Sequence, residues 1–301
     1  MKRIISSVLL LGVCLTPLTV PVMVQPSGGQ SQNSQVQEVE RLIQQAKQQQ
    51  QQGKPQQAIE TWQQVLTLAR QLKDRKNEAL ALNDIGGVYY SIFQPQEALK
   101  YLNQALLIRQ EESDSTGIAT TLNDLGVVYE NIGQPQEALK YLNQALPIRR
   151  EVGDRSGEAA TLSNIGAVYN SISQPQEALK YLNQALPIRR EVVDRTGEAA
   201  TLNNIGLAYS NIGQPQEALK YLKEALPMRR EVGDRSGEAA TLNNIGFAYN
   251  NMGQPQEALT YYNEALPILR EVGDRAGEAA TLNNIGFAYN NMGQPQEALT
   301  Y

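Results

Sequence analysis

The sequence predicts an all-α fold, built as a solenoid of stacked antiparallel helix pairs. One observation is a fixed repeat of 286 − 246 = 40 residues, marked by Gly86, Gly126, Gly166, Gly206, Gly246 and Gly286. The other is that apolar residues within each repeat recur with the period of an α-helix. Repeats of this size bury their apolar faces against their neighbours. We therefore expect an elongated array without a single central core.

Each repeat is predicted to contain a first helix, a short turn and a second helix. In the copy at residues 239–278, Leu242, Ile245 and Tyr249 lie on one face of the first helix. Gly253 suits the left-handed residue that ends this helix, and Pro255 suits the first position of the next one. The apolar face of the second helix consists of Ala258, Leu259, Tyr262, Ala265 and Leu266.

The junction between repeats and the interior of the second helix carry their own signals. Asp274 is a suitable N-cap for the following helix. Val193 replaces the glycine found at Gly153, so glycine is not required at that junction. We read the charged run at 149–151 as a solvated helix end. Prolines inside the second helix remove a backbone donor, and we expect a bend at Pro147, Pro187, Pro227 and Pro267.

The N-terminus has the layout of a secretory signal. Lys2 and Arg3 precede an apolar stretch over residues 4–24, which favours export to the periplasm or the outside of the cell. A membrane anchor is less favoured because of Pro17, and lipid attachment at Cys14 because bulky Val13 precedes it. The predicted segments are a signal peptide (1–29), a linker (30–38), six complete units (39–78, 79–118, 119–158, 159–198, 199–238 and 239–278) and an incomplete unit (279–301).

Composition excludes several kinds of chemistry. The chain has no histidine and one cysteine, Cys14, so imidazole bases, disulfides and Cys/His zinc sites are not expected in the mature protein. A net charge of −5 gives no long-range attraction to nucleic acid. We expect a non-enzymatic protein with no metal or other cofactor, no nucleic-acid partner and no small-molecule substrate.

The pattern of the two helices resembles the tetratricopeptide repeat (TPR). The residues that carry this resemblance are Leu202, Gly206, Tyr209, Ala218, Leu222 and Ala225, and it extends over residues 39–301. The spacing exceeds the usual repeat of about 34 residues and is similar to that of the kinesin light chain and LGN type. The resemblance implies a right-handed superhelix whose concave groove is lined mainly by the first helices and binds a protein or peptide.

Asparagines and apolar residues share one face of the first helix. Asn243, Phe247 and Asn250 are spaced i, i+4, i+7, and a carboxamide can both donate to and accept from an extended peptide backbone. The predicted peptide-binding residues are Asn123, Asn203, Leu207, Asn243, Phe247, Asn250, Asn283, Phe287 and Asn290. A merely solvated face is the alternative, because residues 237–261 recur unchanged at 277–301 and duplication alone would multiply an asparagine.

One position on this face differs between copies, and its apolar bulk rises toward the C-terminal end, through Gly87, Val127, Ala167, Leu207, Phe247 and Phe287. Either it forms a graded apolar groove or it drifts on a permissive surface. In the first unit, the glutamines at 48–52 predict a polar capping helix, and Trp62 is expected in the core.

Three functional hypotheses follow. The first is a non-catalytic scaffold that holds an extended segment of another protein. The second is the N-terminal part of a caspase-like CHAT protease, since similar bacterial arrays often precede such a domain; its His and Cys pair would have to lie beyond residue 301. The third is head-to-tail self-association. Because the sequence stops early in a predicted second helix, we expect a truncation there.

Overall fold

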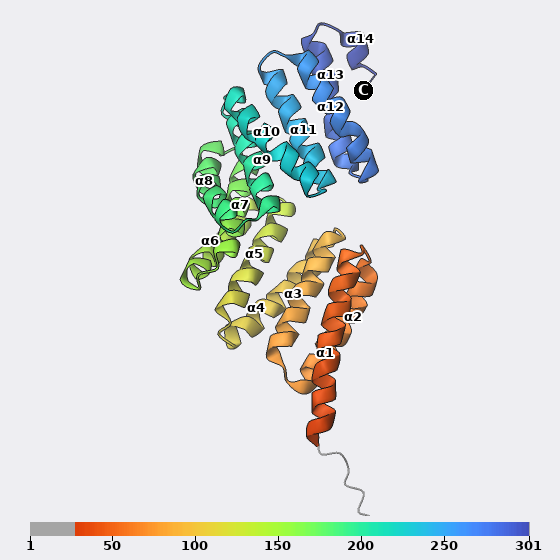
Figure 1. The fold of residues 1–301 in the computed structure, drawn as a ribbon, viewed down its shortest axis with the longest axis vertical. Helices are drawn as coiled ribbons and strands as arrows, with labels where there is room; N and C mark the ends of the chain where they lie inside the picture. The colour runs from red at the N-terminus through yellow and green to blue at the C-terminus, as the bar shows by residue number, and fades with distance from the viewer. Residues whose placement is uncertain (1–27, 301) are drawn as a thin grey trace, which may run out of the picture.

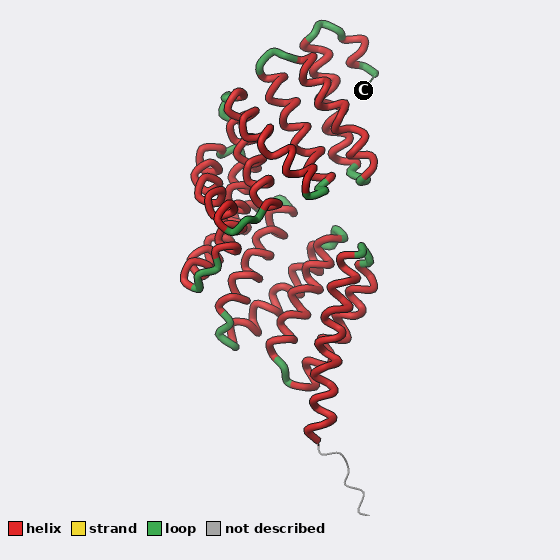
Figure 2. The backbone as a smooth tube through the Cα atoms, in the orientation of Figure 1, coloured by secondary structure: helices red, strands yellow, loops and turns green. Residues whose placement is uncertain are grey.

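The computed structural model describes residues 28–300, and over that range every regular element is an α-helix (Figures 1 and 2). The helices are α1 (Gly28–Gln51), α2 (Pro55–Leu72), α3 (Arg75–Ser91), α4 (Pro95–Glu111), α5 (Ser115–Asn131), α6 (Pro135–Glu151), α7 (Arg155–Ser171), α8 (Pro175–Glu191), α9 (Arg195–Asn211), α10 (Pro215–Glu231), α11 (Arg235–Asn251), α12 (Pro255–Glu271), α13 (Arg275–Asn291) and α14 (Pro295–Ala298). The predicted all-α, right-handed superhelical solenoid of antiparallel pairs is confirmed.

Local signals place the helix ends where the sequence predicts them. Gly253 follows α11 with a φ of 70°, and Pro255 opens α12. Asp274 caps α13, its Oδ1 accepting from the backbone N–H of Gly277 at 2.9 Å. The corresponding aspartates cap α3, α5, α7, α9 and α11 in the same way. Each turn between pairs therefore satisfies a first amide of the next odd-numbered helix, whereas the turn inside a pair has no side-chain cap and relies on the proline that opens the even-numbered helix.

The turns keep a left-handed residue even where glycine is replaced. Val193 has a φ of 56° and Phe93 a φ of 58°, and both side chains are largely exposed. The prediction that glycine is not required is confirmed. The turns nevertheless keep the same left-handed backbone conformation, so Val193 and Phe93 carry the strain of an L side chain at positive φ.

The prolines of the second helices do not interrupt them. Helix α6 continues through Pro147 to Glu151, and α8, α10 and α12 likewise contain their prolines. Each helix is continuous through its proline, and the expected bend of the helix axis stays a prediction. Pro147 is exposed, so water can solvate the carbonyl that lacks a donor.

The core is distributed along the array. Leu142 of α6, Ile165 of α7 and Ala185 of α8 belong to one cluster, and similar clusters join other neighbouring pairs. Helices within a pair approach closely at the repeated glycines: a Cβ on Gly126 would lie 2.6 Å from Leu142 Cγ. Neighbouring pairs therefore bury one another, as expected for a solenoid.

The first pair forms the N-terminal end of the described array. Trp62 is fully buried, as predicted, and its Nε1 donates to Gln50 Oε1 at 3.2 Å. Residues 30–38, predicted as a linker, lie in α1 instead; the segment has no proline or glycine to stop a helix. Residues 1–27 of the predicted signal peptide, with Cys14, lie outside the described residues.

The helix pairs also begin earlier than the predicted units. The third and fourth helices, α3 and α4, run from Arg75 to Glu111, whereas the predicted unit was 79–118. The other predicted unit boundaries likewise fall inside odd-numbered helices. The period of a repeat fixes its length but not its starting point, and the aspartate caps supply the starting point.

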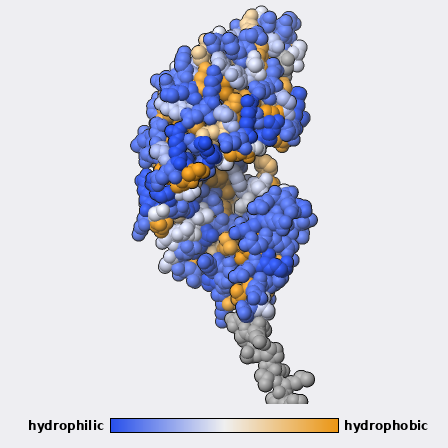
Figure 3. All heavy atoms as spheres, viewed as in Figure 1, coloured by the Kyte–Doolittle hydropathy of each residue, from blue (hydrophilic) through white to orange (hydrophobic). Residues whose placement is uncertain are grey.

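Odd-numbered helices form the inner layer of the superhelix. From α3 to α13, each odd-numbered helix packs against the next odd-numbered helix as well as against its own even-numbered partner. Among the described residues, no two even-numbered helices pack against each other to a similar extent. In a curved stack the inner elements are the closer ones. Figure 1 shows both ends curving toward the same side, and Figure 3 shows the surface hollowed between them.

Candidate functional site

The candidate site is the face of the odd-numbered helices that no even-numbered helix covers. On α9 this face contains Asn204 and Leu207, both partly exposed, whereas Leu202 and Ile205 are fully buried. We call the equivalent residues on the six helices from α3 to α13 the inner wall. Its members are Asp84, Gly87, Asp124, Val127, Asn164, Ala167, Asn204, Leu207, Asn244, Phe247, Asn284 and Phe287.

The predicted asparagines lie beside the inner wall and bond neighbouring helices together. Asn123 Oδ1 accepts from Asn164 Nδ2 at 3.0 Å and from Thr161 Oγ1 at 3.2 Å. Asn203 Oδ1 accepts from Asn244 Nδ2 at 3.0 Å. Asn243 Nδ2 donates to Thr281 Oγ1 at 2.8 Å. These three carboxamides are thus already used to set the spacing of adjacent helix pairs.

The other predicted asparagines divide into two groups. Asn250 is buried, and its Oδ1 accepts from Asn291 Nδ2 at 3.0 Å. Asn283 and Asn290 of α13 are exposed. The structure therefore leaves Asn283 and Asn290 open to solvent, and gives Asn250 a structural contact.

The asparagines at the next position of the odd-numbered helices were missed from the sequence. Asn164 and Asn244 each donate an N–H to the previous odd-numbered helix, and both side chains are partly exposed, so their Oδ1 atoms are available as acceptors for a peptide N–H. The signal was present in the run Leu-Asn-Asn-Ile-Gly, whose second asparagine becomes aspartate at Asp84 and Asp124.

The predicted apolar residues do lie on the inner wall. Leu207 and Phe247 are partly exposed, and Phe287 is 58% exposed. Toward the N-terminus the same position shrinks: a Cβ on Gly87 would meet no atom within 4 Å. Cavities follow this change, with a volume of about 280 Å³ beside Gly87 and about 60 Å³ between Val127 and Ala167. Apolar bulk thus increases along the wall.

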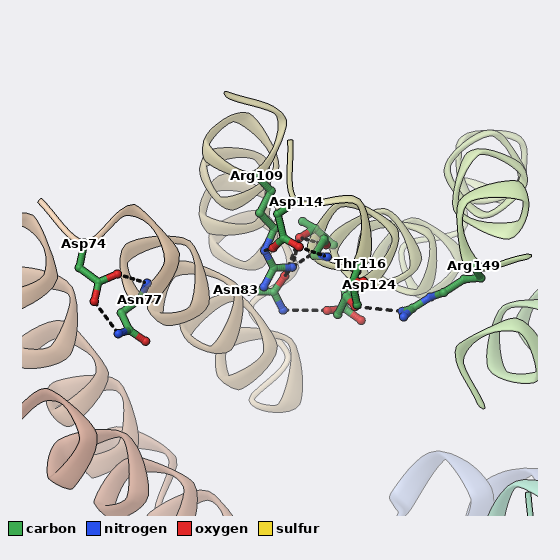
Figure 4. A network of polar contacts seen from close by, with 11 residues as sticks. Asp74, Asn77, Asn83, Arg109, Asp114, Thr116, Asp124 and Arg149 are labelled. Carbon is green, nitrogen blue, oxygen red and sulfur yellow. Dashed lines mark hydrogen bonds and ion pairs between the residues drawn. The ribbon is translucent and has the colours of Figure 1, made fainter. Parts of the chain in front are cut away.

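A polar network supports the N-terminal part of the wall (Figure 4). Buried Arg109 donates through Nη1 to Asn83 Oδ1 at 3.1 Å and to Gly117 O at 2.7 Å. Asn83 Nδ2 donates in turn to Asp124 Oδ2 at 2.8 Å. Burial lowers the pKa of Arg109 and raises the pKa of Asp124. The network fixes the position of Asp124 at the groove.

Other carboxyl groups on this part of the wall are perturbed by burial. Burial raises the pKa of Asp84 from 3.8 to about 6, with Lys47 and Arg109 opposing the shift and Asp124 adding to it. Burial also raises the pKa of Glu130, which is not a member of the wall but lines the small cavity at Val127 and Ala167. These carboxylates are poorly solvated, and a cationic ligand group interacts most favourably with a carboxylate in such surroundings.

The described residues contain no cluster of metal-ligand type, and no helix among them is long and apolar enough to cross a membrane. The inner wall offers carboxamides, carboxylates and apolar side chains along a continuous curved surface.

The chain belongs to the tetratricopeptide repeat family. The profile of that family matches residues 41–111, 93–151, 117–191, 157–231 and 237–301, nearly all of the described array. The resemblance deduced from the sequence is therefore confirmed. No curated protein matches the chain.

Solved structures share the fold. Aspartyl phosphate phosphatase F from Bacillus subtilis has a TM-score of 0.72 at 18% identity, covering 91% of this chain and 70% of its own. The nearly identical TPR-like repeats of a putative kinesin light chain from Podosopora anserina have a TM-score of 0.53 at 23% identity, covering 65% and 97%.

A signal transduction ATPase with numerous domains, carrying a tetratricopeptide repeat sensor, from Pyrococcus horikoshii has a TM-score of 0.63 at 17% identity. The match covers 79% of this chain and only 36% of that protein. At these identities the likeness establishes the fold alone. The TPR fold supports a protein-interaction scaffold.

Proposed function

We propose that the protein is a non-catalytic scaffold that binds an extended segment of another protein along the inner wall. The observation that carries the proposal is the row of half-exposed amide and apolar side chains that recurs on α7, α9 and α11. An extended strand has the complementary pattern, because its backbone groups and side chains also repeat along one direction.

The inner wall can contact a segment of considerable length. Five steps separate α3 from α13, and packed helices lie about 8–10 Å apart, so the wall extends over about 45 Å. An extended chain covers about 3.3 Å per residue, which gives a segment of about 14 residues. The site is therefore better suited to a linear segment than to a small molecule.

Selection from a displayed library of linear peptides would test this function. We expect enriched peptides to bind the purified array in fluorescence polarisation, and the Leu207→Ala and Phe247→Ala variants to weaken that binding. Gln144→Ala changes an exposed residue of α6 on the outer layer and serves as the matched control. Equal loss with Gln144→Ala, or no enriched peptide at all, would contradict the proposal.

The bound state would use the predicted apolar residues but different asparagines from those first predicted. Asn203→Ala and Asn243→Ala are expected to loosen the packing of neighbouring pairs, because both side chains bond the next helix. Asn204→Ala and Asn284→Ala are the changes that remove amide groups from the wall itself, whereas Asn244→Ala belongs with the packing set because Asn244 donates to Asn203. Comparing peptide affinity with melting temperature for the two sets separates a packing role from a binding role.

Three further hypotheses remain predictions from the sequence. A caspase-like domain beyond residue 301 would be found by sequencing past that position. Head-to-tail self-association would appear as concentration-dependent light scattering. Export would appear as a mature N-terminus near residue 30 in material recovered outside the cytoplasm.

A further inference from the structure

The two halves of the inner wall differ in charge. On α3 and α5 the polar position is occupied by Asp84 and Asp124. On the four helices from α7 to α13 the same position is neutral, with Asn164, Asn204, Asn244 and Asn284. The backbone setting of each residue is equivalent, so the difference lies in the side-chain charge alone.

The charged half is also the hollow half. The cavity of about 280 Å³ is lined by residues of α1, α3, α4 and α5, among them Gln50, Asp84, Gly87, Tyr90 and Asp124. A second cavity of about 450 Å³ continues from Gln50 and Gly87 toward the turn after α1. Gly87 creates this space, since Val127 occupies the equivalent position one pair later. The hollow has room for a long side chain.

The hollow contains a carboxylate without a direct partner. Asp124 accepts from Asn83, but Asp84 forms no hydrogen bond or ion pair with any residue that the structure describes. Lys47 and Arg109 are the positive groups that act on Asp84 from α1 and α4. Tyr90 of the same helix provides an aromatic wall. A cationic side chain in this space would meet a carboxylate and an aromatic ring together.

The opposite half of the wall is apolar. Leu207, Phe247 and Phe287 lie on α9, α11 and α13, with the neutral asparagines beside them. A charged ligand group would be desolvated there without a compensating charge, whereas a leucine or phenylalanine side chain would bury apolar area. Each half thus favours a different class of side chain.

We propose that the inner wall binds its segment in one fixed direction, with a lysine or arginine in the hollow at Asp84 and Asp124 and apolar residues against Leu207 and Phe247. This inference rests on the proposed function and specifies its ligand. About 24–30 Å separates α3 from α9 over three steps of helix packing, which an extended chain covers in about 7–9 residues. The ligand is therefore basic at one end and apolar at the other.

Peptides of designed sequence test the inference. The probe is a labelled 14-residue peptide with two lysines near one end, two leucines about eight residues away and a Gly/Ser spacer. The control peptides replace the lysines with glutamine or with glutamate, and both orders of the basic and apolar ends are made. Affinity is measured by fluorescence polarisation at low and moderate salt.

Matched variants come from the chain itself, since asparagine already stands at this position on α7, α9 and α11. We expect Asp84→Asn with Asp124→Asn to weaken the lysine peptide about tenfold, to leave the glutamine peptide unchanged and to abolish the salt dependence. Phe247→Ala should weaken both peptides. The single variant Asp84→Asn keeps the Asn83–Asp124 hydrogen bond and should lose only part of the affinity for the lysine peptide.

The outcomes separate the inference from the proposed function. If lysine, glutamine and glutamate peptides bind equally, or if the aspartate variants change nothing, the inference is wrong while peptide binding itself stands. If Phe247→Ala also has no effect, or if no designed peptide binds, both are wrong. Circular dichroism of each variant verifies that the helices remain folded.

Discussion

Two adjacent glycines of α3 allow a sharp test of the packing. Gly86 faces α4, where an added Cβ would lie 2.8 Å from Leu102 Cγ and 3.2 Å from Ala98 O. Gly87 faces the groove, where the same atom would meet nothing within 4 Å. Both positions lie inside one helix, so alanine gains the same propensity of about 0.5–1 kcal/mol at each. The difference between the two variants therefore isolates the steric cost.

We expect Gly86→Ala to be less stable than Gly87→Ala by about 1–3 kcal/mol, the usual cost of overpacking. Relative to the parent protein, Gly87→Ala should be more stable by about 0.5–1 kcal/mol. Urea unfolding followed by circular dichroism measures the change in the free energy of unfolding of the whole array. Because repeat arrays open locally, hydrogen exchange of α3 and α4 shows whether that change arises in this pair. Equal effects of the two substitutions would refute the close approach of α3 and α4.

Three other changes have expected outcomes. Pro147→Leu, which copies Leu107 of α4, should stabilise α6 by up to about 3 kcal/mol because it restores a backbone donor; an unchanged urea midpoint would contradict this. Val193→Gly should raise the melting temperature, because it relieves a backbone strain of about 1–2 kcal/mol at the left-handed position. A lower melting temperature would show that the valine side chain stabilises the fold by more than this strain destabilises it. Burial raises the pKa of Asp84 from 3.8 to about 6, so ionisation of Asp84 opposes folding, and its contribution to the free energy of unfolding should rise as pH falls from 7 through 6 toward 4. In parallel urea titrations, the Asp84→Asn variant should show a smaller rise than the parent protein. An identical pH profile of the two proteins would count against the shifted pKa.

The sequence predicts the fold closely because each signal is local and repeated. The period defines the pairs, and Asp274, Gly253 and Pro255 predict the start and end of helices from backbone chemistry alone. Those local rules apply whatever the neighbouring pair does. The predicted unit boundaries fall inside helices because a periodic pattern contains no starting point.

The candidate site was predicted less well because it depends on the angle between pairs. Asn243 and Asn244 are successive residues, about 100° apart around the helix, and both border the apolar stripe. Which of them bonds to the next helix and which lines the groove is decided by how α11 and α13 cross. Asn243 proved to bond Thr281, and the sequence pattern holds no information on that crossing.

Arg149 shows the same limit. The charged run at the end of α6 was predicted to be solvated, yet Arg149 is buried, pairs with Asp154 and donates to Thr120 Oγ1 at 3.0 Å. Gly157 makes room for it, since a Cβ there would lie 2.6 Å from Arg149 Nε. The glycine and the arginine form one packing arrangement that only the stacked structure reveals.

Site-specific photocrosslinking tests the central claim most directly. Benzoylphenylalanine placed at Leu207 lies on the inner wall, and at Leu107 it lies on an exposed position of α4. With a peptide selected for binding, we predict crosslinks from position 207 and none from position 107 above the level of a scrambled peptide. Crosslinks from position 107 alone, or equal yields from both, would contradict binding along the inner wall.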